Sequence, residues 1–390
     1  MLKLPLYLDY NATTPCDPRV MEVMTPYFTE NFGNAASRDH SFGWHASEAV
    51  QYAREQVAGL IGAVSTEIIF TSGATEADNL ALKGVFEMFR SKGNHIITSV
   101  VEHKAVLDTC RHLEKLGADV TYLKVNSEGL VDPEELEAAF KPTTILVAIM
   151  YANNETGTVM PVKKISAVTR KKGVFFFSDA TQAVGKIPID VNNDGIDLLA
   201  FSSHKMYGPK GAGALFLRRK DPRVKLTAQI DGGGHERGIR SGTLNVPGIA
   251  GFGKACELCK QEMKQEAKRL SAWRDKLETS LLKLKDTFVN GSTRFRLPHV
   301  TNISFNFVES EGLISGIQKD IAVSSGSACS SASREPSYVL KALGVADELA
   351  RGSIRFSLGR FTTEEQIDFA IVKFIETINQ LRTLNPYWKT

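Results

Sequence analysis

The chain has 390 residues, of which 43% are hydrophobic and 23% are charged, and its formal net charge is +3. This length and composition predict a globular protein with one large domain and a smaller companion. The small net charge and the dispersed Lys and Arg residues argue against a surface built for nucleic acid, so we expect no direct nucleic-acid partner.

The cysteines and the start of the chain indicate a reducing compartment. Five scattered cysteines do not form a disulfide framework. Pro5 and Asp9 interrupt the N-terminal apolar residues before a secretory segment forms. Because no run approaches the roughly 20 apolar residues of a membrane span, we expect a cytoplasmic protein without a membrane partner. Cys256 and Cys259 fall on an expected helix, and a single pair cannot supply four zinc ligands.

Apolar runs alternate with helical patterns from about residue 50 to 215, which predicts an α/β fold with a mostly parallel sheet of seven strands. The expected strands are 67–71, 96–101, 120–125, 144–150, 174–178, 198–202 and 214–218, and helices are expected at 74–90 and 106–116.

The rest of the chain predicts a second unit. A long amphipathic helix is expected at about 253–285, followed by a strand at 300–308, a Ser/Gly/Ala tract at 324–333, a helix, a strand at 353–358 and a last helix from 363. These elements predict a smaller α+β domain.

Polar residues follow the expected strands, where parallel sheets bind ligands. Small residues after 67–71 open a helix at Ala74 and Thr75, which suits a phosphate. After later strands come His103, whose imidazole can stack on a planar group and move protons, and Asn154, whose amide can hold a carboxylate or a ring. Each residue alone is equally typical of a cap, a turn or a surface.

An acid and an amine follow two neighbouring strands. Asp179, with Gln182 three residues later, ends the Phe-rich strand, and Lys205 follows the next strand between Ser202 and His204 on one side and glycine on the other. Such an amine forms a Schiff base with pyridoxal 5'-phosphate (PLP), and such an acid keeps the pyridine nitrogen protonated. The ordered set predicts a PLP enzyme.

At these residues the sequence resembles the cysteine desulfurases of the NifS/IscS class, which are fold type I PLP enzymes of the class-V aminotransferase family. The resemblance is carried by residues 7–15, 71–76, 102–107, 179–182, 202–205, 232–237, 240–243 and 324–329. It implies PLP fold type I, with a large domain at 15–260 and a small domain made of 1–14 and 261–390.

The resemblance also implies roles for single residues. Lys205 holds PLP, Asn154 and Arg355 hold the substrate carboxylate, and Thr243 reaches the phosphate of the neighbouring subunit in a homodimer. The remaining cofactor residues are Ala74, Thr75, Ser202 and His204 for the phosphate, and Asp179, Gln182, His103 and Asn154 for the ring.

Cys329 distinguishes a sulfur enzyme from other chemistry on this fold. It lies in the Ser/Gly/Ala tract, whose small side chains suit a loop that moves. We expect Lys205 to remove the Cα proton of L-cysteine, the Cys329 thiolate to take the sulfur as a persulfide, alanine to leave, and His103 to accept the proton of the substrate thiol.

The persulfide is expected to pass to an acceptor protein such as an iron–sulfur scaffold. The resemblance further implies that Cys329 can ligate a transient [2Fe-2S] cluster shared with that scaffold.

Three alternatives stay open from the sequence. An aminotransferase uses the same PLP residues and has no use for Cys329. A selenocysteine lyase also uses these residues and tolerates the loss of Cys329. A cysteine hydrolase pairs Cys329 with His103 and needs no PLP. The third alternative is a catalytically silent subunit that only relays sulfur. The presence of Lys205 and Asp179 argues against it, because such a subunit does not need them.

Overall fold

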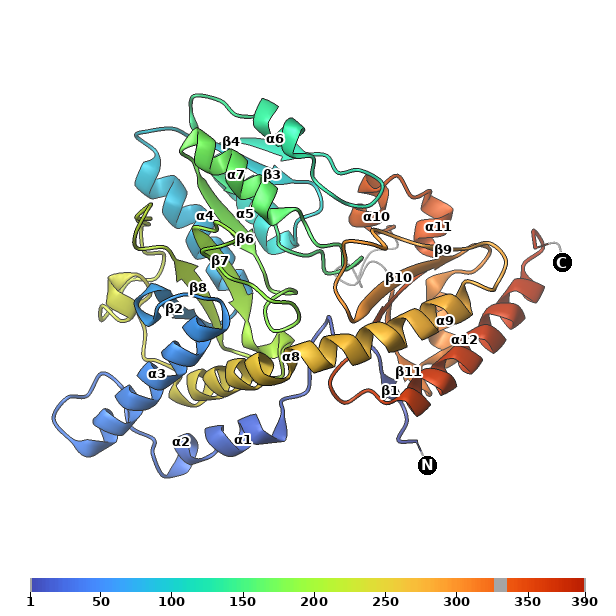
Figure 1. The fold of residues 1–390 in the computed structure, drawn as a ribbon, viewed down its shortest axis with the longest axis horizontal. Helices are drawn as coiled ribbons and strands as arrows, with labels where there is room; N and C mark the ends of the chain where they lie inside the picture. The colour runs from blue at the N-terminus through green and yellow to red at the C-terminus, as the bar shows by residue number, and fades with distance from the viewer. Residues whose placement is uncertain (1, 326–334, 389–390) are drawn as a thin grey trace.

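The protein consists of two lobes, each built on its own β-sheet (Figure 1). The computed structural model describes residues 2–325 and 335–388. The sheet of the large lobe has seven strands in the order β2-β8-β7-β6-β5-β3-β4, and only β8 runs antiparallel to its neighbours. This confirms the predicted fold class. The strands are β2 (Ile68–Thr71), β3 (His95–Ser99), β4 (Asp119–Leu123), β5 (Thr144–Ala148), β6 (Phe175–Asp179), β7 (Leu198–Ser202) and β8 (Gly213–Leu217).

Helices cover both faces of this sheet because its strands are apolar on both sides. In β7, Leu199 and Phe201 belong to one buried cluster, and Leu198 and Ala200 belong to the other. One face packs against α4 (Ala74–Phe89) and α5 (Lys104–Lys115). The other packs against α3 (Ser41–Leu60), α7 (Val162–Lys172) and the first half of α8 (Val246–Leu281). Near-continuous apolar strands are typical of such doubly covered sheets.

The small lobe has an antiparallel sheet in the order β12-β13-β10-β9. The N-terminal strand β1 pairs with β11, and Leu6 and Leu8 share a buried cluster with apolar residues after 265. The first residues therefore pack with the last third of the chain. The elements are β1 (Leu6–Tyr7), β9 (Thr287–Val289), β10 (Val300–Phe305), β11 (Ile321–Ala322), β12 (Ser324–Ser325), β13 (Ser353–Ser357), α9 (Ser310–Ile317), α10 (Tyr338–Ala342), α11 (Asp347–Arg351) and α12 (Glu364–Leu384).

Helix α8 runs along both lobes (Figure 1). Its first half buries Cys256 and Cys259 against the large lobe, and its second half buries Leu270 and Leu277 in the small one. It begins earlier than the sequence pattern predicted because Asn245 caps it by accepting a hydrogen bond from the Gly248 amide. The shorter helices are α1 (Pro18–Met24), α2 (Pro26–Thr29) and α6 (Pro133–Ala138).

Within the part of the chain that the structure describes, no helix combines the length and the apolar character needed to cross a membrane. The four cysteines of this part, at 16, 110, 256 and 259, are free.

Candidate active site

A cavity of about 560 Å³ opens at the ends of β2, β3, β5, β6 and β7, and Arg355 of the small lobe also lines it. Most residues predicted for the site line it: Ala74, Thr75, His103, Asn154, Asp179, Gln182, Ser202, His204, Lys205 and Arg355. Thr243 does not line it and is exposed in this chain. Cys329 lies outside the described residues.

One end of the cavity is formed by the start of α4. The helix begins after Gly73 without a side-chain cap, so its first N–H groups face the cavity unpaired within the helix. The Glu76 carboxylate holds this turn. It accepts hydrogen bonds from the amide and the hydroxyl of Ser72 and forms an ion pair with Arg240 at 2.7 Å. The positive end of a 16-residue helix favours an anionic group such as a phosphate.

Two further polar residues that line the cavity come from the end of β7 and the turn that follows it. Ser202 ends the strand, and a ring nitrogen of His204 lies 3.1 Å from the Thr13 hydroxyl. Burial, together with the nearby ammonium groups of Lys205 and Lys210, lowers the pKa of His204 to about 4. The imidazole is therefore neutral near pH 7, and a bound anion would offset the two ammonium charges.

A close backbone contact fixes the loop before α4. A Cβ atom on Gly213, the first residue of β8, would lie 2.5 Å from the Cα atom of Gly73. Only glycine at 213 lets this loop lie directly on β8.

Lys205 lies in the turn that follows β7. Its ammonium group donates hydrogen bonds to the carbonyl oxygens of Asn11 and Ala12, both at 2.7 Å. The Gln182 side chain also donates to the Asn11 carbonyl, at 3.1 Å. Asn11 and Ala12 line the cavity, and the sequence analysis gave them no role. The sequence analysis looked for polar residues directly after the strands of the large sheet, and Asn11 and Ala12 follow none of these strands.

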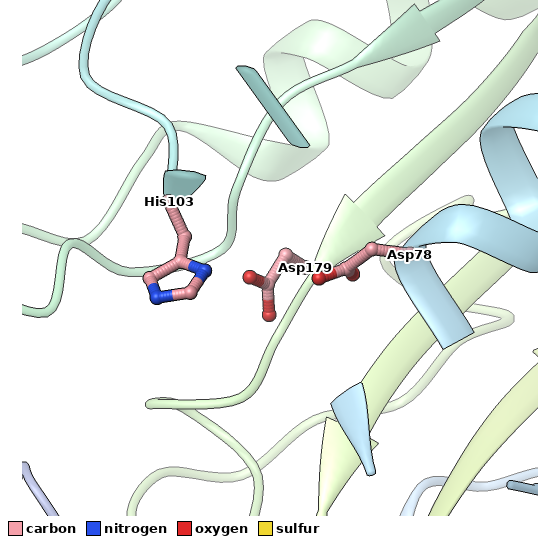
Figure 2. Close-up of side chains that lie close together, drawn as sticks. All are labelled: Asp78, His103 and Asp179. Atoms are coloured by element: carbon pink, nitrogen blue, oxygen red, sulfur yellow. The ribbon is translucent and has the colours of Figure 1, made fainter. Parts of the chain in front are cut away.

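Another part of the cavity wall is acidic. Asp179 ends β6, is buried, and accepts a hydrogen bond from the Thr181 amide at 2.9 Å. A carboxylate oxygen of Asp179, one of Asp78 and a ring nitrogen of His103 all lie within 4.8 Å of one another (Figure 2). Such groups can hold a metal ion, but the lysine and the helix start in the same cavity suit a pyridine cofactor better.

The sequence analysis did not single out Asp78. The sequence does contain a pattern that could have identified it, because the helical spacing of Asp78, Ala81 and Val85 places all three on the buried face of α4. An acid on a buried helix face is uncommon without a partner or a function.

The small lobe contributes Arg355 from β13. Its guanidinium donates to the Asn154 carbonyl at 2.9 Å and pairs with Asp9 at 2.6 Å. The Arg355 Nε and the Asn154 Oδ1 are buried and have no hydrogen-bond partner among the described residues.

Four residues that border the cavity carry such unpartnered buried polar atoms within the described ranges: Asp78, Asn154, Thr181 and Arg355. Buried polar groups are rarely left unsatisfied, so the cavity is built for a polar ligand. A helix start fits a phosphate, a lysine amine fits an aldehyde, and a buried acid fits a protonated ring nitrogen. This donor set fits PLP.

The family model for class-V aminotransferases matches residues 6–369. The chain belongs to this family. Within it, the chain is 56% identical over 389 residues to the cysteine desulfurase IscS of Anaeromyxobacter sp. (strain K), covering 100% of this chain and 96% of that protein.

Solved structures of the family agree. A NifS-like protein superposes with a TM-score of 0.90 at 38% identity and covers 97% of this chain and 100% of its own. SspA in complex with cysteine has a TM-score of 0.81 at 36% identity, with 92% of this chain and 100% of that chain covered. These likenesses identify the chain as a PLP-dependent cysteine desulfurase of the class-V aminotransferase family.

Proposed function

We propose that this cysteine desulfurase converts L-cysteine to L-alanine, holds the sulfur as a persulfide on Cys329 and passes it to acceptor proteins. The observation that supports this most is one cavity with Lys205 and Asp179 on its walls and an anion site at the start of α4. PLP bound there supplies an electron sink for the charge left when the substrate loses its Cα proton.

In this proposal the chain's residues hold the cofactor and move the proton. Lys205 would hold the cofactor covalently and then accept the Cα proton of the substrate, and the carbonyls of Asn11 and Ala12 orient its amine. The phosphate would be held by Ala74, Thr75, Ser202 and His204, and the ring by Asp179, Gln182, His103 and Asn154, all of which line the cavity.

Arg355 and Asn154 would bind the substrate carboxylate. Both present buried polar atoms without a partner in the described part of the chain. Arg355 keeps its position through Asp9 and the Asn154 carbonyl, so an arriving carboxylate meets a fixed guanidinium.

The chain on either side of Cys329 is attached beside the cavity, which supports its role as sulfur acceptor. Ser324 of β12 pairs with Arg355 of β13. Cys329 lies four positions after Ser325, a span of at most about 14 Å. On the other side, the hydroxyl of Tyr338 donates a hydrogen bond to the carbonyl oxygen of Glu102, next to His103. His103 would accept the thiol proton of the substrate.

Homodimer formation is part of the proposal. Phe28, Phe32, Trp44 and Tyr52 are each about 60% exposed on α2, α3 and the loop between them. We propose these exposed apolar side chains as the surface that meets the partner subunit. Thr243, exposed in this chain, would reach the phosphate in the partner subunit.

Three further expectations remain proposals. They are a cytoplasmic location, an iron–sulfur scaffold as acceptor, and a transient [2Fe-2S] cluster bound through Cys329 as cargo. The division into a large domain at 15–260 and a small domain of 1–14 and 261–390 is also proposed. The burial of Leu6 and Leu8 with the later residues supports that division.

Intact-protein mass spectrometry tests the proposal. After incubation with L-cysteine, the wild type should gain the mass of one or more sulfur atoms and release alanine, whereas Cys329→Ser should retain PLP without gaining sulfur. Borohydride should fix a pyridoxyl adduct on Lys205. A colourless protein without this adduct, or sulfur gain in Cys329→Ser, would contradict the proposal.

A further inference from the structure

Asp78 is a buried acid without a role in the proposed reaction. Its side chain is 1% exposed, and neither carboxylate oxygen has a hydrogen-bond partner in the described part of the chain. It nevertheless lines the cavity. An ionised carboxylate in such a place carries a desolvation penalty of several kcal/mol. The position therefore favours a neutral carboxyl group or one that meets a partner when the cavity is filled.

The acid that lies close to Asp78 in the cavity is Asp179. The Asp78 carboxyl points from α4 toward Asp179 at the end of β6, and His103 lies on the other side of Asp179 (Figure 2). One oxygen of each acid and a ring nitrogen of His103 lie within 4.8 Å of one another. At this separation the negative charge of one carboxylate disfavours ionisation of the other.

The surroundings decide which acid keeps the proton. Asp179 accepts a hydrogen bond from the Thr181 amide, whereas Asp78 has no such donor among the described residues. Burial, and then the charges of Asp179 and Glu102, raise the pKa of Asp78 well above its usual range. The titratable groups that face Asp78 are Asp179 on β6 and Glu102 and His103 before α5.

We propose that Asp78 is a positioning residue that stays protonated and donates a hydrogen bond to the Asp179 carboxylate, fixing the acid that faces the ring nitrogen of the cofactor. The inference rests on the proposed function, because Asp179 is the ring acid only when PLP binds here. The pair then carries one negative charge, which matches the single positive charge of a protonated ring nitrogen.

Two substitutions of similar size separate the roles that Asp78 can have. Asp78→Asn keeps a neutral N–H donor, and Asp78→Leu removes it. PLP is titrated into each apoprotein, and its dissociation constant is read from the visible absorbance. The dissociation constant of Asp78→Asn for PLP should stay within about threefold of the wild-type value. Asp78→Leu should bind PLP at least about tenfold more weakly, which is the scale of a hydrogen bond to a charged group.

Two other patterns overturn the inference. If both variants bind PLP equally weakly, PLP binding needs a negative charge on Asp78. Wild-type affinity in both means that Asp78 does not act on the ring site.

Infrared spectroscopy of the apoprotein near pH 7 gives a second test that needs no Leu variant to fold. A carbonyl stretching band of a protonated carboxylic acid should be present in the wild type and weaker in Asp78→Asn. Glu102→Gln is the matched control, because Glu102 contributes its own band. A wild-type spectrum that Asp78→Asn leaves unchanged overturns the inference.

The two proposals fail in different ways. A wild type that binds no PLP refutes the proposed function, whereas PLP binding and sulfur gain with the wrong Asp78 pattern refute only the role of Asp78.

Discussion

The hydroxyl of Tyr338, in the small lobe, donates a 2.6 Å hydrogen bond to the backbone carbonyl of Glu102, in the large lobe. The bond attaches the chain that follows the Cys329 tract to the residue before His103. Beside it, the Ser337 hydroxyl donates to the Glu155 carboxylate, next to Asn154. These two contacts join the small lobe to two walls of the cavity.

Tyr338→Phe should slow sulfur transfer to Cys329 several-fold while leaving the affinity for PLP unchanged. Loss of this partly buried hydrogen bond costs about 1 kcal/mol and loosens the attachment of the chain beside His103. The rate of persulfide formation is followed by quenching and mass spectrometry. Tyr122→Phe is the control, since that hydroxyl bonds Glu114 at the surface. Equal rates in both variants would refute the prediction.

Arg355→Lys should raise the KM for L-cysteine about tenfold or more, because lysine keeps the charge but loses the planar fork that binds a carboxylate at two points. Steady-state kinetics with saturating PLP measure this. Arg382→Lys is the matched control: Arg382 is also buried, and its guanidinium donates to the carbonyls of Asn306 and Asp286 in the small lobe. An unchanged KM in Arg355→Lys would remove Arg355 from substrate binding.

Gly213→Ala should weaken PLP binding at least about tenfold, because the added Cβ displaces Gly73 and with it the start of α4. Absorbance titration of the apoprotein gives the dissociation constant. In Gly312→Ala the new Cβ has its nearest neighbour at 3.9 Å, so PLP binding should not change. Similar affinities in the two variants would show that the contact between Gly213 and Gly73 does not shape the phosphate site.

The stability of the apoprotein should fall from pH 5.5 to 7.5 more steeply than that of Glu102→Gln. Burial raises the pKa of Glu102 from 4.5 to about 8. Between these values the folded protein binds more protons than the unfolded chain, so this stabilisation is complete below pH 4.5 and is lost as pH rises through 8.

Urea unfolding at the two pH values measures the effect, which is at most about 3 kcal/mol over two pH units. Glu114→Gln, on the exposed surface of α5, should keep the wild-type slope. Parallel profiles for the wild type and Glu102→Gln would mean that Glu102 ionises normally.

The sequence predicted residues that act through their local position. Asp179 and Lys205 each follow an apolar strand, and both were expected at the ligand-binding edge because parallel strands end there together. The seven strands of the large sheet were expected within a few residues of their observed bounds, since short continuous apolar runs leave a local pattern in the sequence.

Residues that reach the cavity through long-range packing were not predicted from local pattern. Asn11 meets Lys205 across 194 positions of the chain, and no periodicity relates them. Arg355 was expected only through the family resemblance, because it enters from a second sheet whose register with β10 places it opposite Asn302.

The amino-acid sequence by itself therefore determined the fold class, the family and the polar residues that end each strand, because hydrophobic periodicity and short motifs are local properties of the chain. Only the tertiary structure decided that Asp78 faces Asp179 and that Asn11 and Arg355 close the cavity. Those contacts depend on how α4, the N-terminal segment and the small lobe pack, which is set by cooperative burial over the whole molecule.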